Sequence, residues 1–144
     1  MTISPWHQTL WRSLQQRSQV IPSSTLLVGR PGTDVLNLGM ELAGLLLCNA
    51  EISDRPCTTC SSCHMFKQGV HPDLHVVSTE EAEGVGDLRF RSHSMRYSDT
   101  DTTKRERRTT VRSIITVDQI RVVTDALNKT AGLGSSKVCL IYPA

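Results

Sequence analysis

Helix-spaced apolar positions occur in three parts of the chain. Ser4 and Pro5 are typical of a helix start, because serine caps free backbone amides and proline fits the first turn. Thr33 or Asp34 is the candidate cap of a second helix, and Thr116 that of a third. The expected apolar faces are Trp6, Leu10 and Leu14 in the first helix, Leu36, Met40, Ala43 and Leu47 in the second, and Val117, Ile120, Val123 (or Thr124) and Leu127 in the third.

Short apolar runs predict three buried strands, at 25–28, 74–77 and 137–142. Strands that alternate with helices favour an α/β fold with a parallel sheet flanked by helices. The chain stops two residues after the third strand. We therefore expect residues 1–144 to be a partial domain, the front part of a longer protein.

Two polar stretches interrupt this pattern. Residues 48–63 are short and rich in cysteine, and residues 82–113 are rich in serine, threonine and arginine. We expect 82–113 to be a long loop or a disordered insert. The whole chain has a net charge of +2, but residues 89–112 carry eight basic and three acidic side chains. This basic segment could contact DNA phosphates, although charge runs are more often solvated loops.

The chain has no features of a secreted or membrane protein. Its first eleven residues lack the charged segment and apolar run of a signal peptide, and no apolar stretch approaches the length of a membrane span. We expect a soluble, cytoplasmic protein without a membrane partner. In such a reducing compartment, five cysteines indicate metal or redox chemistry before disulfides.

Four of the cysteines have a spacing typical of a metal site. Eight, two and two residues separate Cys48, Cys57, Cys60 and Cys63. Four thiolates complete a tetrahedral shell and leave no open position, so we predict one structural zinc ion per chain, in a module over 48–66. Independent core thiols, a disulfide and an iron–sulfur cluster are the competing interpretations. Cys139 lies in a predicted strand and is expected to be a core residue.

The loop between the first strand and the second helix has the setting of a phosphate-binding P-loop. A working loop has the pattern G-x-x-x-x-G-K-[ST], in which the lysine neutralises phosphate and the hydroxyl binds magnesium. When Gly29 is aligned with the first glycine, Asp34 replaces the second glycine, Val35 the lysine and Leu36 the hydroxyl residue, while Gly32 lies inside the loop. We therefore expect no ATP binding. An ordinary strand-to-helix turn that never bound nucleotide is the alternative.

The end of the third strand points the same way. A catalytic version would end in acidic residues that bind magnesium and position water, but Tyr142 and Pro143 occupy these positions. Phosphoryl transfer depends almost entirely on positioning and electrostatics, so the sequence predicts no intrinsic ATPase activity.

Together these features resemble the delta-prime subunits of the bacterial DNA polymerase III clamp loader. The resemblance excludes 82–113 and rests on Pro5-Trp6, the degenerate loop Gly29 to Leu36, the four cysteines, His71-Pro72-Asp73-Leu74, Val117-Asp118-Gln119-Ile120-Arg121, Gly134, Lys137-Val138 and Pro143-Ala144. It implies a P-loop NTPase fold of the AAA+ type with an inserted four-cysteine zinc module. In that family the domain is followed by a lid and a collar domain, and both would lie beyond residue 144. The motif that presents an arginine to the ATP of a neighbouring subunit would also lie there.

The resemblance implies a non-catalytic subunit that helps load the sliding clamp on primed DNA during replication. Its expected partners are the motor (gamma/tau) and delta subunits, the sliding clamp and, through the complex, primed DNA. Two alternatives remain: a stand-alone zinc-containing nucleic-acid-binding or regulatory protein, and an active gamma/tau-like ATPase, against which Val35 and Leu36 argue. His71-Pro72-Asp73 also matches the tripeptide of J-domain co-chaperones, but there it lies between two basic helices, whereas a strand is predicted here.

Overall fold

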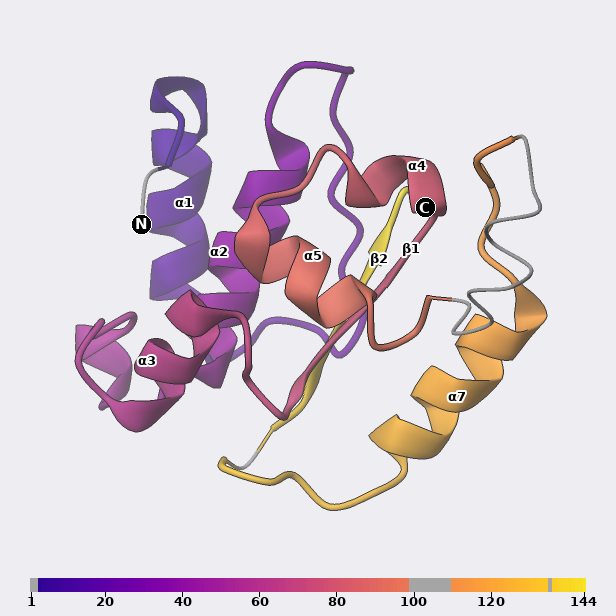
Figure 1. Cartoon of the computed structure of the whole chain (residues 1–144). Helices are drawn as coiled ribbons and strands as arrows, with labels where there is room; N and C mark the ends of the chain where they lie inside the picture. Colours follow the sequence, from indigo (N-terminus) through magenta and orange to yellow (C-terminus); the bar gives the residue numbers. More distant parts are fainter. Residues whose placement is uncertain (1–2, 99–109, 135) are drawn as a thin grey trace.

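A computed structural model describes residues 3–98, 110–134 and 136–144 (Figure 1). The elements in chain order are η1 (Pro5–His7), α1 (Gln8–Gln16), α2 (Val35–Leu47), η2 (Ile52–Asp54), α3 (Ser61–Gln68), β1 (Leu74–Ser78), α4 (Glu80–Glu83), α5 (Leu88–Ser94), α7 (Val117–Leu127) and β2 (Val138–Tyr142). The protein is thus a mixed helix and strand fold. Within the described ranges, no helix is long and apolar enough to span a membrane.

The two strands form a small parallel sheet between helices. β1 pairs with β2 so that Leu74 lies opposite Val138 and Ser78 opposite Tyr142. Figure 1 shows α2 and α5 on one side of the strands and α7 on the other. Because successive side chains point to opposite faces, Leu74 and Val76 join the core on the α2 side, whereas Val77 joins the cluster on the α7 side. The strands predicted at 74–77 and 137–142 are therefore confirmed.

The larger core lies between α2, α3, α5 and the sheet. Its buried members are Met40, Ala43, Leu47, Phe66, Leu74, Val76 and Phe90, with Leu36, Val138, Leu140 and Tyr142 packed at its margin. The predicted face of the second helix is confirmed, because all four of its apolar residues belong to this cluster. The Phe90 ring meets the Tyr142 ring edge to face, with centroids 6.1 Å apart.

The expectation of a loop throughout 82–113 is wrong for its first part. Residues 88–94 form α5, and Asp87 caps this helix by accepting the Phe90 amide. Local sequence did not reveal the helix because its stability comes from packing: Phe90 and His93 are fully buried against residues distant in sequence. The part of the insert at 99–109 lies outside the described residues.

The strand predicted at 25–28 is not a strand in the structure. Among the described residues the segment has no ladder partner, and Leu26 and Val28 are 74% and 84% exposed. A strand requires a neighbouring backbone about 4.8 Å away, and an apolar run cannot supply that neighbour by itself. Leu27 still packs toward α2, with its Cδ1 atom 3.7 Å from the position of a Cβ atom on Gly39.

The third predicted helix is confirmed, but its apolar face is mostly not buried. Thr116 and Gln119 form the capping box of α7, in which each side chain accepts a backbone amide of the other residue. Val123 is buried, whereas Val117 is 66% exposed. The apolar face predicted for the first helix is likewise largely exposed at Trp6 and Leu10. Trp6 is 63% exposed and is held by its indole nitrogen, which donates to the Thr33 carbonyl at 3.0 Å.

Candidate functional site

The four cysteines of the predicted module lie together. Their sulfur atoms are all within 4.8 Å of one another. The Sγ atoms of Cys48 and Cys57 are 3.6 Å apart, those of Cys48 and Cys60 4.0 Å, and those of Cys57 and Cys63 4.0 Å. A tetrahedron of sulfurs about 2.3 Å from a zinc ion has edges of roughly 3.8 Å. The cluster therefore fits a single tetrahedral metal ion such as zinc.

Local backbone geometry brings the sulfurs to one point. Cys48 ends α2 with an extended backbone, which turns the chain away from the helix axis. Thr58 has a positive φ of 61°, which tightens the loop between Cys57 and Cys60. Cys60 then caps α3, its sulfur accepting the Cys63 amide at 3.4 Å. Each two-residue spacing thus becomes a turn that aims two sulfurs inward.

The surroundings of the thiols differ. Backbone amides of Thr59 and Cys60 lower the pKa of Cys57 to about 6. Burial opposes ionisation of Cys60, but the amides of Cys63 and Asn49 outweigh it and lower the pKa of Cys60. Burial raises the pKa of Cys48 and of Cys63. Metal binding would offset this cost, since a coordinating thiol is deprotonated by the ion.

Neighbouring polar residues and the fifth cysteine do not join this cluster. His64 is exposed and lies outside the group of close ligand atoms, so the four cysteines suffice without it. Arg55 donates to the Ala50 carbonyl at 2.7 Å and lines the same small cavity as Cys48, whereas Lys67 is exposed on α3. Cys139 is only half-buried, on the α7 side of the sheet, so it is a marginal core residue and not a ligand candidate.

The loop Gly29 to Leu36 is filled by its own side chains. A Cβ atom on Gly29 would lie 2.2 Å from the Val35 Cγ2 atom and 2.7 Å from the Thr33 hydroxyl. The residue in the position of the P-loop lysine therefore packs back against the first glycine. Thr33 closes the loop through bonds from its amide and hydroxyl to the Arg30 carbonyl, at 3.1 and 2.7 Å. Gly32 has a φ of +84°, which favours glycine.

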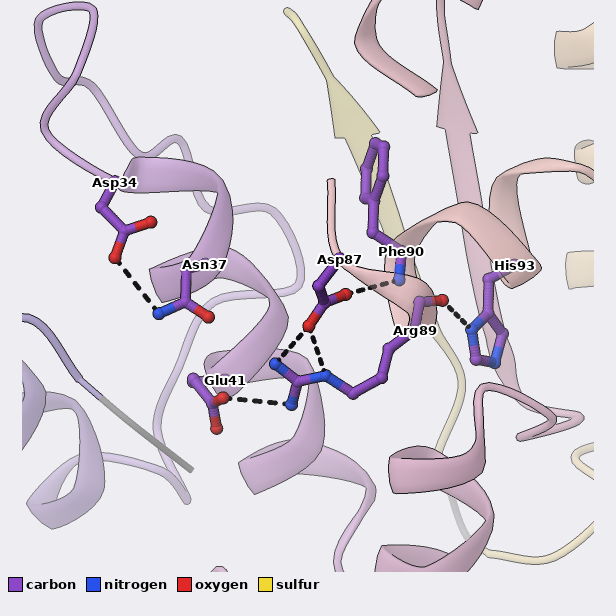
Figure 2. Close-up of polar contacts among 7 residues, drawn as sticks. All are labelled: Asp34, Asn37, Glu41, Asp87, Arg89, Phe90 and His93. Atoms are coloured by element: carbon purple, nitrogen blue, oxygen red, sulfur yellow. Dashed lines mark hydrogen bonds and ion pairs between the residues drawn. The ribbon is translucent and has the colours of Figure 1, made fainter. Parts of the chain in front are cut away.

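Asp34 lies at the start of α2 and is held from both sides. It has a left-handed φ of 61°, which aspartate tolerates better than most residues. Its Oδ2 atom accepts the Asn37 side-chain amide at 3.2 Å (Figure 2) and the Ser4 hydroxyl at 2.6 Å. The N-terminal segment thus braces the loop, a contact between residues 30 positions apart that local sequence patterns did not reveal.

The His71-Pro72-Asp73 segment forms a buried corner before β1. The Asp73 carboxylate accepts the amides of Gly132 and Leu133 at 2.6 and 2.9 Å. Burial opposes ionisation, but these amides outweigh it and lower the pKa of Asp73. Burial lowers the pKa of His71, which favours the neutral ring. Asp73 therefore shapes the entry to β1 and ties it to the turn before β2.

α5 is joined to α2 by a buried ion pair. Arg89 contacts Glu41 at 3.1 Å and Asp87 at 2.6 Å (Figure 2), and its guanidinium lies 5.1 Å from the centre of the Phe66 ring. The Glu41 side chain is 1% exposed. His93 anchors the same helix, with one ring nitrogen 2.7 Å from the Arg89 carbonyl and the other 3.2 Å from that of His71.

Sequence similarity to known proteins assigns the chain to a family. A sequence model described as "DNA polymerase III, delta subunit" matches residues 6–144. The chain belongs to this family. A DNA polymerase III subunit delta' of Pseudomonas aeruginosa is 31% identical over 142 residues, which are 99% of this chain and 34% of that protein. One of Haemophilus influenzae is 29% identical over 84 residues, 57% of this chain and 25% of that protein.

These relatives confirm the resemblance to delta-prime subunits. The chain spans about a third of the length of the Pseudomonas relative and a quarter of that of the Haemophilus relative. No solved structure matches the chain.

Proposed function

We propose that the protein is an ATP-inert subunit of the bacterial DNA polymerase III clamp loader, which helps load the sliding clamp on primed DNA. The family supports assignment to this complex, because both relatives are DNA polymerase III delta' subunits. The observation that carries ATP-inertness is the filled loop, in which Val35 lies against Gly29. A gamma/tau-like ATPase would need a lysine there.

The fold we infer is a P-loop domain of the AAA+ type. The parallel pair β1 and β2, the helices on both of its faces and a glycine-containing loop before α2 support it. The loop departs from a working P-loop at Asp34, Val35 and Leu36. Such a domain does not change its conformation in response to ATP. It can therefore act in the cytoplasm as a rigid support against which the ATP-driven motor subunits move.

The metal centre we propose is one structural zinc ion on Cys48, Cys57, Cys60 and Cys63. The support is the close packing of the four sulfurs and the amides that favour thiolate at Cys57 and Cys60. The ion would supply folding free energy to a loop with little apolar content, on the order of 10 kcal/mol.

The test of the function is assembly. The full-length protein is mixed with the motor and delta subunits of the same organism, and the mixture is separated by size-exclusion chromatography. A common complex that contains all three proteins is expected. If folded proteins elute separately, the clamp-loader proposal fails and the alternative of a stand-alone zinc-containing nucleic-acid-binding or regulatory protein takes its place.

A further inference from the structure

We propose that metal binding at the four cysteines is thermodynamically coupled to the turn before β2, through a hydrogen-bonded chain of Ser62, His71 and Asp73. The inference rests on the zinc site proposed above. It concerns side chains that are not ligands, and it assigns a role to the buried His-Pro-Asp corner.

The first link joins the metal module to His71. Ser62 precedes the ligand Cys63, and Leu47 precedes the ligand Cys48. The Ser62 hydroxyl donates to the Leu47 carbonyl at 2.5 Å and lies 2.8 Å from the Nε2 atom of His71. Ser62 and His71 are each 1% exposed, so water does not compete for these bonds. Placement of two ligands therefore also places Ser62.

The second link joins His71 to the turn before β2. The Asp73 amide donates to the Nδ1 atom of His71 at 3.1 Å, which requires an unprotonated Nδ1 and leaves the proton on Nε2 for Ser62. The Asp73 carboxylate holds the amides of Gly132 and Leu133, and its carbonyl accepts the Val138 amide at 3.0 Å. Every donor in this hydrogen-bonded chain thus has one acceptor.

The metal module and the turn before β2 also lie in direct contact. A Cβ atom on Gly134 would lie 3.2 Å from the Asn49 Oδ1 atom, and Asn49 follows Cys48. Cys48, Asn49, His71, Asp73 and Gly134 line one small cavity. The turn therefore rests directly on the metal module, and loosening either one removes support from the other.

Coupling of this kind is reciprocal. If metal binding stabilises the turn, breaking the anchor of the turn must weaken metal binding by the same factor. Asp73 is ten residues from the nearest cysteine ligand in sequence. A loss of zinc affinity when Asp73 is substituted would therefore come from the broken hydrogen-bonded chain and not from the loss of a metal ligand.

The experiment measures the zinc affinity of the full-length protein by competition with a chromophoric chelator. Asp73→Asn and Ser62→Ala are each expected to lower the affinity about 5-fold or more. The matched controls are Asp118→Asn, at a side chain that is 83% exposed, and Ser61→Ala, one position from Ser62 on the exposed side of α3. Both controls are expected to keep the wild-type affinity.

The double variant Ser62→Ala/Asp73→Asn decides whether the residues act as one chain. Its zinc affinity is expected to be no lower than that of the single variant that binds zinc less tightly, because either change alone already breaks the hydrogen-bonded chain. Additive losses, or an Asp73→Asn protein with wild-type affinity, would overturn the proposal.

Hydrogen exchange gives an independent readout. Chelation of zinc is expected to raise amide exchange at 130–134 in the wild type, and by less in Ser62→Ala. An equal rise in both proteins contradicts the chain. A wild-type protein that binds no zinc refutes the metal site itself, which separates this failure from a failure of the coupling.

Discussion

At the scale of the residue, the four sulfurs are prepared unequally for metal. The amides of Thr59 and Cys60 lower the pKa of Cys57 to about 6, which favours its thiolate form. Cys48 and Cys63 are buried, and burial raises the pKa of both. The metal must therefore displace protons from the buried pair, and we expect zinc affinity to rise with pH.

Single substitutions separate the ligands from the remaining cysteine. Cys60→Ala is expected to abolish binding of one zinc per chain and to loosen residues 48–66, because three thiolates leave the shell open. Cys139→Ala is the matched control and is expected to keep the metal, since Cys139 lies on the α7 side of the sheet. Elemental analysis of the purified proteins measures both, and iron in a brown wild-type protein would contradict zinc.

The buried histidines predict a fall in stability in mild acid. Burial lowers the pKa of His71, His75 and His93 below the ordinary histidine value of about 6.5. The unfolded chain takes up protons first, so stability is complete above about pH 6.5 and is lost as the pH falls toward the folded-state pKa values.

His75 offers a test of this pH dependence at a site outside the cluster of Cys48, Cys57, Cys60 and Cys63. Its Nδ1 atom bonds the Tyr97 hydroxyl, and its Nε2 atom has no partner among the described residues. His75→Gln is expected to reduce the loss of stability between pH 7.5 and about 5.5. Urea denaturation at both pH values measures it, with His7→Gln outside the core as control. An unchanged pH dependence would show that His75 does not contribute.

At the scale of the element, α5 is held by contacts that its own sequence does not display. Phe90 enters the main core, while Arg89 pairs with Glu41 of α2 and lies over Phe66 of α3. A buried charge is costly to leave alone, so Glu41 and Arg89 depend on each other.

Removal of the arginine should therefore destabilise the protein strongly. Arg89→Ala is expected to lower the free energy of unfolding by about 3 kcal/mol, because Glu41 is left without its cation in the core. Arg121→Ala is the matched control, since the side chains of its ion pair with Asp118 are 75% and 83% exposed, and such pairs contribute at most about 1 kcal/mol. Chemical denaturation measures both. Equal small losses would mean that water reaches Glu41.

At the scale of the whole molecule, the sheet separates two unequal halves. The α2 side carries the larger core, the cysteine module and α5, whereas the α7 side buries Val77, Tyr97 and Val123. The degenerate loop lies at the start of α2, braced by Ser4 and Trp6 from the N-terminal segment. Within the loop, Val35 and Thr33 lie against Gly29.

The filled loop predicts that the full-length protein does not bind Mg-ATP. Val35 provides no charge for phosphate and Leu36 no ligand for magnesium, while the Asp34 carboxylate repels the nucleotide. Isothermal titration is expected to show no heat of binding, with the motor subunit of the same organism as positive control. Tight Mg-ATP binding would falsify the inert-loop proposal.

Features that depend on local chemistry follow from the order of the residues alone. Helix caps, helix-spaced apolar positions, short apolar runs and the cysteine spacing act over a few residues, so α2, α7, the two strands of the sheet and the cysteine module were predicted. The missing lysine and hydroxyl of the loop are also facts of sequence, because no fold can restore a side chain that is absent.

Features that depend on partners distant along the chain arise only when the whole chain packs. Residues 25–28 have the apolar character of a strand but no hydrogen-bonded partner strand among the described residues. α5, in contrast, is a polar stretch that forms a helix because Phe90, His93 and Arg89 find buried partners. Asp73 meets Gly132 across 59 positions, and Ser4 meets Asp34 across 30. Hydrogen bonds and burial across such separations depend on how the whole chain packs, and local periodicity carries no record of them.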